Sequence, residues 1–181
     1  MTNSSESSTD CHPGIIFALM VFKKYVSKDQ ALQKAKHYCG YQERSHKEVK
    51  EKLYSFGLFR SDVEQLLSQL IEENYLNEER FAQHFAGGKF RMKHWGRMKI
   101  KHELKQKQVS EYCIKIALKE IDEASYMKTL KKLASVKWGA LKKEKTVFSK
   151  LRKTHDYLLQ KGYERDLITQ VIANLHEKNE D

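Results

Sequence analysis

The sequence predicts an all-α protein made of three tandem three-helix repeats, resembling helix-turn-helix units, that form an elongated, curved array. Pro13 is the only proline of the 181-residue chain, so no proline interrupts a helix from residue 14 onward. Lysine, leucine, glutamate, glutamine and alanine, which favour helices, are abundant. One pattern of apolar residues recurs at distances of 51 and 54 residues, from Leu58 to Val109 to Tyr163.

The repeated pattern consists of a helix, a turn and the apolar stripe of a second helix. The turn residues are Gly57, Gln108 and Gly162; the glycines suit a left-handed turn, whereas Gln108 suits it poorly. A unit of three short helices buries little alone, so we expect neighbouring units to share apolar faces. The matching positions are Val49, Ile100 and Thr154; Leu53, Leu104 and Leu158; Leu58, Val109 and Tyr163; Val63, Ile114 and Ile168; Leu66, Ala117 and Val171; and Leu67, Leu118 and Ile172.

Local signals place the helices in order. Ser45 and Ser61, each followed three residues later by glutamate, predict capping boxes, and Asn77 and Asp122 are expected to cap the helices that open the second and third repeats. We expect an N-terminal extension at 1–26 and repeats at 27–75, 76–121 and 122–178. Their helices are expected at about 28–40, 45–56, 61–73, 77–93, 96–107, 110–120, 123–140, 144–161 and 164–177.

The N-terminal extension begins with a polar segment, residues 1–10, that we expect to be disordered. The apolar run Ile15–Phe22 is too short to cross a bilayer, and it follows Glu6 and Asp10 rather than basic residues, so it is a poor signal peptide. Either it packs on the first helices or it is an appended remnant without a structural role. No membrane association is expected.

Three cysteines, Cys11, Cys39 and Cys113, are widely spaced and form no Cys-x-x-Cys pair. This spacing argues against a disulfide framework or a zinc site and favours a reducing compartment, so we expect a cytoplasmic protein.

Positive charge is concentrated in the second half of the chain. Residues 1–88 hold 11 basic and 12 acidic side chains, whereas residues 89–181 hold 23 and 12. This asymmetry indicates a polyanionic partner or an acidic protein surface, and the alternative is a solvated lysine-rich surface.

Basic residues recur at helical spacing in one segment. Lys93, Arg97, Lys101 and Lys105 are spaced by four, which predicts a positive stripe on one side of a helix. The stripe either meets a partner or only solubilises the helix. A second cluster contains Lys142, Lys143, Lys145, Lys150, Arg152 and Lys153. The candidate partner-binding residues are Arg44, Arg91, Lys93, Arg97, Lys101, Lys105, Lys142, Lys143, Arg152 and Lys153.

Aromatic residues lie near both basic segments. Phe90, Trp95, Tyr126 and Trp138 could stack on nucleic-acid bases or anchor an interface. Aromatic residues at helical spacing are more often part of a core, so both interpretations stay open.

No constellation typical of catalysis is present in the sequence. His102-Glu103 lacks the second histidine of a zinc protease motif, because position 106 is Gln106. The run Gly87–Lys89 is followed by Phe90 where a phosphate loop needs Ser or Thr. We therefore expect no enzymatic activity, no cofactor and no metal site.

Four segments resemble the RecX family of bacterial recombination regulators. Arg44-Ser45-x-x-Glu48-Val49-x-x-Lys52-Leu53 is similar to the family's Arg-Ser-x-x-Glu-Leu-x-x-Lys-Leu opening. Asn74-Tyr-Leu-Asn-Glu-Glu-Arg-Phe-Ala82 is similar to its Gly-Tyr-Leu-Asp-Asp-x-Arg-Phe-Ala segment. Gly96-Arg97-x-x-Ile100-x-x-Glu103-Leu104 matches the helix that follows, and Lys161-Gly162-Tyr163 matches the closing repeat. Asn74 and Gln108 replace usual glycines, and residues 1–26 have no counterpart.

The resemblance covers about residues 30–175 and implies tandem helical repeats without catalysis. It implies binding to the RecA recombinase filament on single-stranded DNA, with modulation of recombinase, ATPase and coprotease activity that is usually inhibitory. The expected protein is a monomer with weak, non-specific affinity for single-stranded DNA.

Two other interpretations are a helix-turn-helix transcription factor and a purely structural helical scaffold. The pair Val49–Gly57 and Ser61–Leu70 suits the first, but the basic helices carry different charge patterns and the first repeat is nearly neutral. The second predicts behaviour that is insensitive to salt, with no DNA affinity.

Overall fold

The computed structural model describes residues 26–144 and 146–177, and every regular element within them is an α-helix. The predicted all-α fold is confirmed, and the helix bounds differ from the prediction by at most three residues. Predictions for residues 1–25, including Cys11 and Ile15–Phe22, lie outside the described part. The helices are α1 (Lys28–Tyr41), α2 (His46–Ser55), α3 (Arg60–Glu72), α4 (Glu78–Lys93), α5 (Arg97–Gln106), α6 (Glu111–Lys119), α7 (Glu123–Ala140), α8 (Val147–Lys161) and α9 (Arg165–Glu177).

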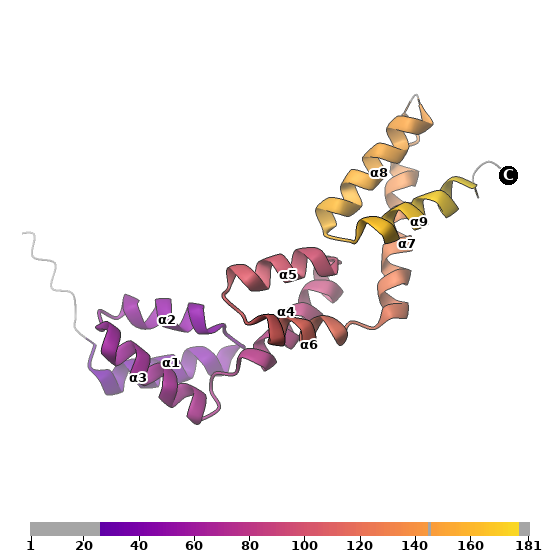
Figure 1. Cartoon of the computed structure of the whole chain (residues 1–181). Coiled ribbons are helices and arrows are strands. Elements are labelled where there is room, and N and C mark those ends of the chain that lie inside the picture. The colour runs from indigo at the N-terminus through magenta and orange to yellow at the C-terminus, as the bar shows by residue number, and fades with distance from the viewer. Residues whose placement is uncertain (1–25, 145, 178–181) are drawn as a thin grey trace, which may run out of the picture.

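The helices pack in groups of three, α1–α3, α4–α6 and α7–α9, which we call repeats 1, 2 and 3. The groups follow one another in a bent row, from the indigo end of the chain to the yellow end (Figure 1). No helix in the described part of the chain is long and apolar enough to cross a membrane.

Three of the four predicted helix caps are present. The Ser45 hydroxyl accepts a hydrogen bond from the Glu48 backbone N–H at 3.2 Å, and the Glu48 carboxylate accepts one from the Ser45 backbone at 3.0 Å, which completes the capping box. Asn77 and Asp122 also cap as predicted. The capping box at Ser61 is wrong: α3 begins one residue earlier, because the Val63 N–H donates to the Phe59 carbonyl at 3.0 Å.

The left-handed turn recurs in all three repeats, even where glycine is missing. Gly57 and Gly162 have φ angles of 85° and 89°, and Gln108 has φ of 61° at the equivalent place. A left-handed residue other than glycine costs about 1–2 kcal/mol. The buried Val109, whose N–H donates to the Leu104 carbonyl at 3.1 Å, offsets this cost by closing the turn into the core.

The repeated apolar positions form the core, as the sequence pattern predicts. Positions before the turn are completely buried in each repeat, including Thr154, whose hydroxyl donates to the Lys150 carbonyl at 2.9 Å. Positions after the turn are buried too, except Leu58 and Leu118, which are partly buried. Repeat 1 has a core of its own, whereas repeats 2 and 3 share one continuous core. The chain therefore consists of one separate unit and one fused pair.

Candidate partner-binding surface

The predicted positive stripe does not lie on a single helix. Lys93 is the last residue of α4, and His94 follows in a left-handed conformation with φ of 53°. Gly96 then starts α5, which carries Arg97, Lys101 and Lys105. The prediction that Lys93 shares a helix face with Arg97 is therefore wrong, because α4 ends at the left-handed His94 and Arg97 begins a different helix.

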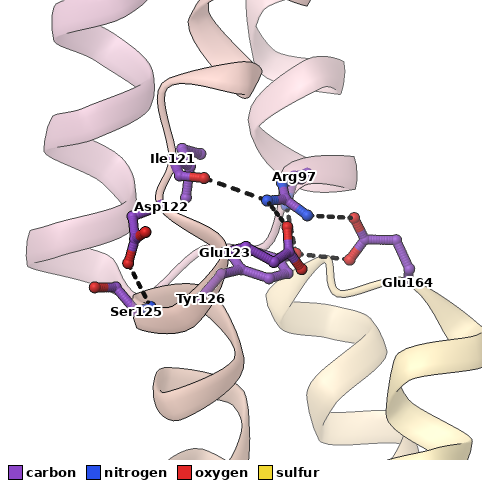
Figure 2. Close-up of polar contacts among 7 residues, drawn as sticks. All are labelled: Arg97, Ile121, Asp122, Glu123, Ser125, Tyr126 and Glu164. Carbon is purple, nitrogen blue, oxygen red and sulfur yellow. Dashed lines mark hydrogen bonds and ion pairs between the residues drawn. The ribbon is translucent and has the colours of Figure 1, made fainter.

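Arg97 lies in the junction between repeats 2 and 3, among groups from α7 and the turn before α9 (Figure 2). Its guanidinium donates to the Glu123 carboxylate at 2.6 Å and to the Ile121 carbonyl at 3.3 Å, and it lies 4.0 Å from the Glu164 carboxylate. It also lies 4.1 Å from the centre of the Tyr126 ring. Burial opposes its charge, but hydrogen bonding and attraction to Glu123 prevail and raise the pKa of Arg97.

The backbone of α5 is joined directly to repeat 3. The first N–H groups of a helix have no partner within the helix. Here the Gly96 N–H donates to the Lys161 carbonyl at 2.8 Å, and the Met98 N–H donates to the Gly162 carbonyl at 3.0 Å. The N–H of the residue between them, Arg97, donates to the Tyr126 hydroxyl at 3.0 Å. The free N–H groups at the start of α5 thus pair with the free carbonyl groups at the end of α8. The partial positive charge of one helix end lies against the partial negative charge of the other.

Glycine is required on both sides of this contact. A Cβ atom built on Gly96 would lie 2.2 Å from the Gly162 carbonyl oxygen, and one on Gly162 would lie 2.2 Å from the Lys99 Cβ. Tyr126 is completely buried beside it; its hydroxyl donates to Glu164 at 2.7 Å, and burial raises its pKa. Repeats 2 and 3 are therefore held at one fixed angle.

Lys101 and Lys105 share a carboxylate on α6. Lys105 pairs closely with Glu111, and Lys101 lies 3.7 Å from it. The hydrogen bond from Lys105 is the main cause that lowers the pKa of Glu111. All three side chains are substantially exposed, so the pairing reduces the local positive charge without adding much stability.

The second basic cluster also divides into paired and unpaired groups. Lys153 pairs with Glu144 at 2.6 Å, and Arg152 lies 3.9 Å from Asp156. Lys150 lies over the buried Trp138 at 4.1 Å from the ring centre. Position 145 lies outside the described residues.

Some candidate residues have no carboxylate partner within 4.0 Å in the described part of the chain. They include Arg91 and Lys93 at the exposed end of α4, and Lys142 and Lys143 in the exposed turn after α7. Arg44 also lacks such a partner, but it is half-buried and stacks on Tyr38, with the guanidinium carbon 4.0 Å from the ring centre. Among the candidate residues, those at the ends of α4 and α7 are therefore both exposed and without a carboxylate partner.

The aromatic residues near the basic clusters belong to the core. Tyr126 is 0% exposed and Trp138 7% exposed, which leaves no ring face for stacking on a base. Phe90 packs 5.7 Å from the Tyr126 ring, and the half-buried Trp95 lies beneath the ammonium groups of Lys89 and Lys99.

Two ion pairs attach repeat 1 to repeat 2, and neither of them was predicted from the sequence. Arg80 donates to the Glu43 carboxylate at 2.6 Å, and Lys107 pairs with Glu48 at 2.7 Å. Burial opposes ionisation of Glu48, but hydrogen bonds from Lys107 and Ser45 prevail and lower its pKa. Arg80 lies in the segment Asn74–Ala82 that carries the resemblance, three residues after the cap of α4, but the sequence does not show its partner. Polar contacts attach repeat 1 to repeat 2, whereas repeats 2 and 3 share a continuous apolar core in addition to their polar contacts.

The chain is similar in sequence to known three-helix domains and proteins. The family model described as the second three-helix domain of RecX matches residues 77–118, and that for the third matches residues 124–172. The regulatory protein RecX of Prosthecochloris aestuarii is 30% identical over 148 residues, which cover 81% of this chain and 93% of the relative. The chain belongs to the RecX family. The resemblance found in the sequence motifs is thus confirmed.

Other RecX proteins extend this comparison. The regulatory protein RecX of Clostridium perfringens is 34% identical over 133 residues, and the match covers 73% of this chain but only 62% of that relative. Two crystal structures have the same fold. RecX from Lactobacillus salivarius aligns with a TM-score of 0.74 at 23% identity, over 82% of this chain and 96% of that one. A second regulatory protein RecX aligns with a TM-score of 0.71 at 20% identity, over 80% and 72%.

The two junctions described above lie at the borders between the three-helix groups of the chain. In this chain, the contact around Arg97 and Gly96 joins the segments that match the second and third three-helix domains of RecX. The Arg80 and Lys107 ion pairs join the first group of helices to the second. In the described residues, no three His, Cys, Asp or Glu side chains are close enough together to hold a metal ion.

Proposed function

We propose that this RecX-family protein binds filaments of the RecA recombinase on single-stranded DNA and lowers their recombinase, ATPase and coprotease activity. Two exposed cationic sites on the fused pair of repeats support the proposal most directly: Arg91 and Lys93 at the end of α4, and Lys142 and Lys143 after α7. A filament on single-stranded DNA carries phosphate groups along its whole length. A rigid body with separated positive sites can engage two such places at once, which strengthens binding.

Most of the other predicted contact residues already have partners within the protein. Arg97 is held in the junction, while Lys101, Lys105 and Lys153 pair with glutamates. We therefore propose that Arg97 acts mainly by fixing the angle between repeats 2 and 3. The exposed Lys101, Lys105, Arg152 and Lys153 are proposed as secondary contacts that exchange their carboxylate partner for the filament.

A titration of RecA ATPase activity on single-stranded DNA tests the proposal. We expect the wild-type protein to lower the activity, and the double substitution Lys142→Glu and Lys143→Glu to weaken this effect strongly because repulsion replaces attraction. The double substitution Lys131→Glu and Lys132→Glu is the matched control, since it makes the same change of charge at another exposed lysine pair of repeat 3. ATPase activity that is unchanged by a stoichiometric excess of wild-type protein would refute the proposal. If both variants inhibit the ATPase equally weakly, Lys142 and Lys143 are not the contact site.

Bare single-stranded DNA should be bound weakly, without sequence preference, by a cytoplasmic monomer. The basic half of the chain would displace counterions, so affinity should fall steeply as salt rises. A titration at two salt concentrations tests this expectation. A tight, sequence-specific footprint at physiological salt would favour a helix-turn-helix transcription factor instead.

A further inference from the structure

An open groove of about 660 Å³ lies on repeat 1, between α1 and α2. Pockets for small ligands have volumes of roughly 300–1,000 Å³. Its walls include three aromatic side chains, Tyr38, Tyr41 and Phe56, and two lysines, Lys34 and Lys52. None of the candidate contact residues lines the groove, and it lies in the half of the chain that has almost no net charge.

The aromatic side chains differ in how far they are covered. Arg44 stacks on Tyr38, and the ammonium groups of Lys34 and Lys52 lie 5.5 and 5.3 Å from the centre of the Phe56 ring. Tyr41, the last residue of α1, is 82% exposed, and no ring or cation of the described residues contacts it. The groove therefore offers one open aromatic face beside rings that already hold cations.

The lysines of the groove differ from their neighbours on the same helices. Lys36 on α1 pairs with Glu73, and Lys50 on α2 pairs with Glu64. Lys34 and Lys52 have no carboxylate within 4.0 Å among residues 26–144 and 146–177, and no acidic residue lines the groove. Positive charge is thus neutralised beside the groove but left uncompensated within it.

We propose that this groove binds single-stranded nucleic acid, with one base stacked on Tyr41 and the adjoining phosphates beside Lys34 and Lys52. Stacking platforms flanked by cations are how proteins hold single strands without reading their sequence, because every base has a flat face. An acidic peptide would satisfy the lysines but would leave the Tyr41 ring exposed. A duplex cannot fill the site, because its bases are stacked on one another. The inference rests on the weak binding of bare single strands proposed above and adds to it a base-stacking site on repeat 1, outside the basic half of the chain.

The test measures how strongly the protein prefers a strand with bases over the same backbone without them. The probes are a labelled oligothymidylate of about ten nucleotides, within the range of single-strand site sizes, and an abasic oligodeoxyribose of equal length. Titrations by fluorescence anisotropy use the full chain at raised salt, which weakens phosphate contacts elsewhere. We expect the wild-type protein to bind oligothymidylate about fivefold or more tightly than the abasic strand, because stacking on one aromatic side chain contributes at least that factor.

Substitutions in the groove test whether Tyr41 causes the preference for a strand with bases. Tyr41→Ala should abolish the preference without changing the affinity for the abasic strand, whereas Tyr41→Phe should keep it. Tyr112→Ala is the matched control, because Tyr112 is 70% exposed on α6 and lies outside the groove. The double substitution Lys34→Gln and Lys52→Gln should weaken both strands and lower the salt dependence.

Three results would overturn the inference: no preference in the wild-type protein, a preference that survives Tyr41→Ala, or competition by polyglutamate as strong as by oligothymidylate. The last result would assign the groove to an acidic peptide. RecA is absent from these titrations, so a negative result would not contradict the proposed regulation of filaments. A negative result in the ATPase titration would likewise not contradict nucleic-acid binding in the groove.

Discussion

Gly96→Ala is the sharpest test of the junction between repeats 2 and 3. The new Cβ would lie 2.2 Å from the Gly162 carbonyl oxygen, 2.3 Å from its carbon and 2.5 Å from the Tyr163 nitrogen. All three are backbone atoms, which cannot turn aside as a flexible side chain can. The start of α5 must therefore withdraw from the end of α8.

The cost follows from the bonds that hold this contact. Withdrawal breaks the hydrogen bonds from Gly96 to Lys161 and from Met98 to Gly162, each of which contributes about 1 kcal/mol net. A carbonyl left buried without a partner adds about 1–3 kcal/mol. We expect a loss of about 3–5 kcal/mol in the free energy of unfolding, or roughly 6–20 °C in melting temperature for a protein of this size.

Gly88→Ala is the matched control, and it should have the opposite sign. Gly88 lies within α4, and nothing would contact its Cβ within 4 Å. Alanine within a helix is favoured over glycine by about 1 kcal/mol, so this variant should melt slightly above the wild type. Thermal unfolding followed by circular dichroism measures both variants. A Gly96→Ala protein that melts within about 1 °C of the wild type, a tenth of the expected shift, would refute the close approach of the two helices.

Two further predictions concern charge and pH. Arg97→Ala should lower the free energy of unfolding by about 2 kcal/mol, because it removes a half-buried ion pair and a ring contact. The control Lys101→Ala should change it by less than about 0.5 kcal/mol. Equal urea midpoints for the two variants would contradict this prediction. Burial raises the pKa of Cys39 from 9.0 to about 11 and that of Tyr126 and Tyr163 above 10, so the unfolded chain releases these protons first. The free energy of unfolding should stay constant below about pH 9 and fall as pH rises toward 11. A urea midpoint that stays constant between about pH 9 and 11 would show that burial does not raise the pKa of these three side chains.

The fold was predictable because its determinants are local. Caps at Ser45, Asn77 and Asp122 lie within three residues of the groups they satisfy, and the apolar spacing of each helix repeats within one or two turns. The wrong prediction at Ser61 has a local origin as well. Phe59 and Ser61 lie two positions apart, and only Ser61 has a side chain that can cap a helix, yet α3 starts after Phe59.

The partners of the charged residues could not be predicted in this way. Arg97 meets Glu123 and Glu164, which lie 26 and 67 positions away, and only the packing of three helices brings them together. The expected helix bounds already placed a break after Lys93, but the residue that makes the turn could not be foreseen. Its left-handed residue is His94, stabilised by tertiary contacts such as the hydrogen bond from the Tyr163 hydroxyl to the His94 carbonyl at 3.3 Å.

The separate core of repeat 1 has a consequence for how binding can be located. Regions with independent cores open independently, so repeat 1 and the fused pair should lose their amide protection in two steps. A ligand stabilises only the unit that it touches. An oligonucleotide held in the groove of repeat 1 would slow hydrogen exchange in α1–α3, and a partner bound at the ends of α4 and α7 would slow it in α4–α9. The unfolding pattern of the unmodified protein thus reports which end of the molecule is occupied.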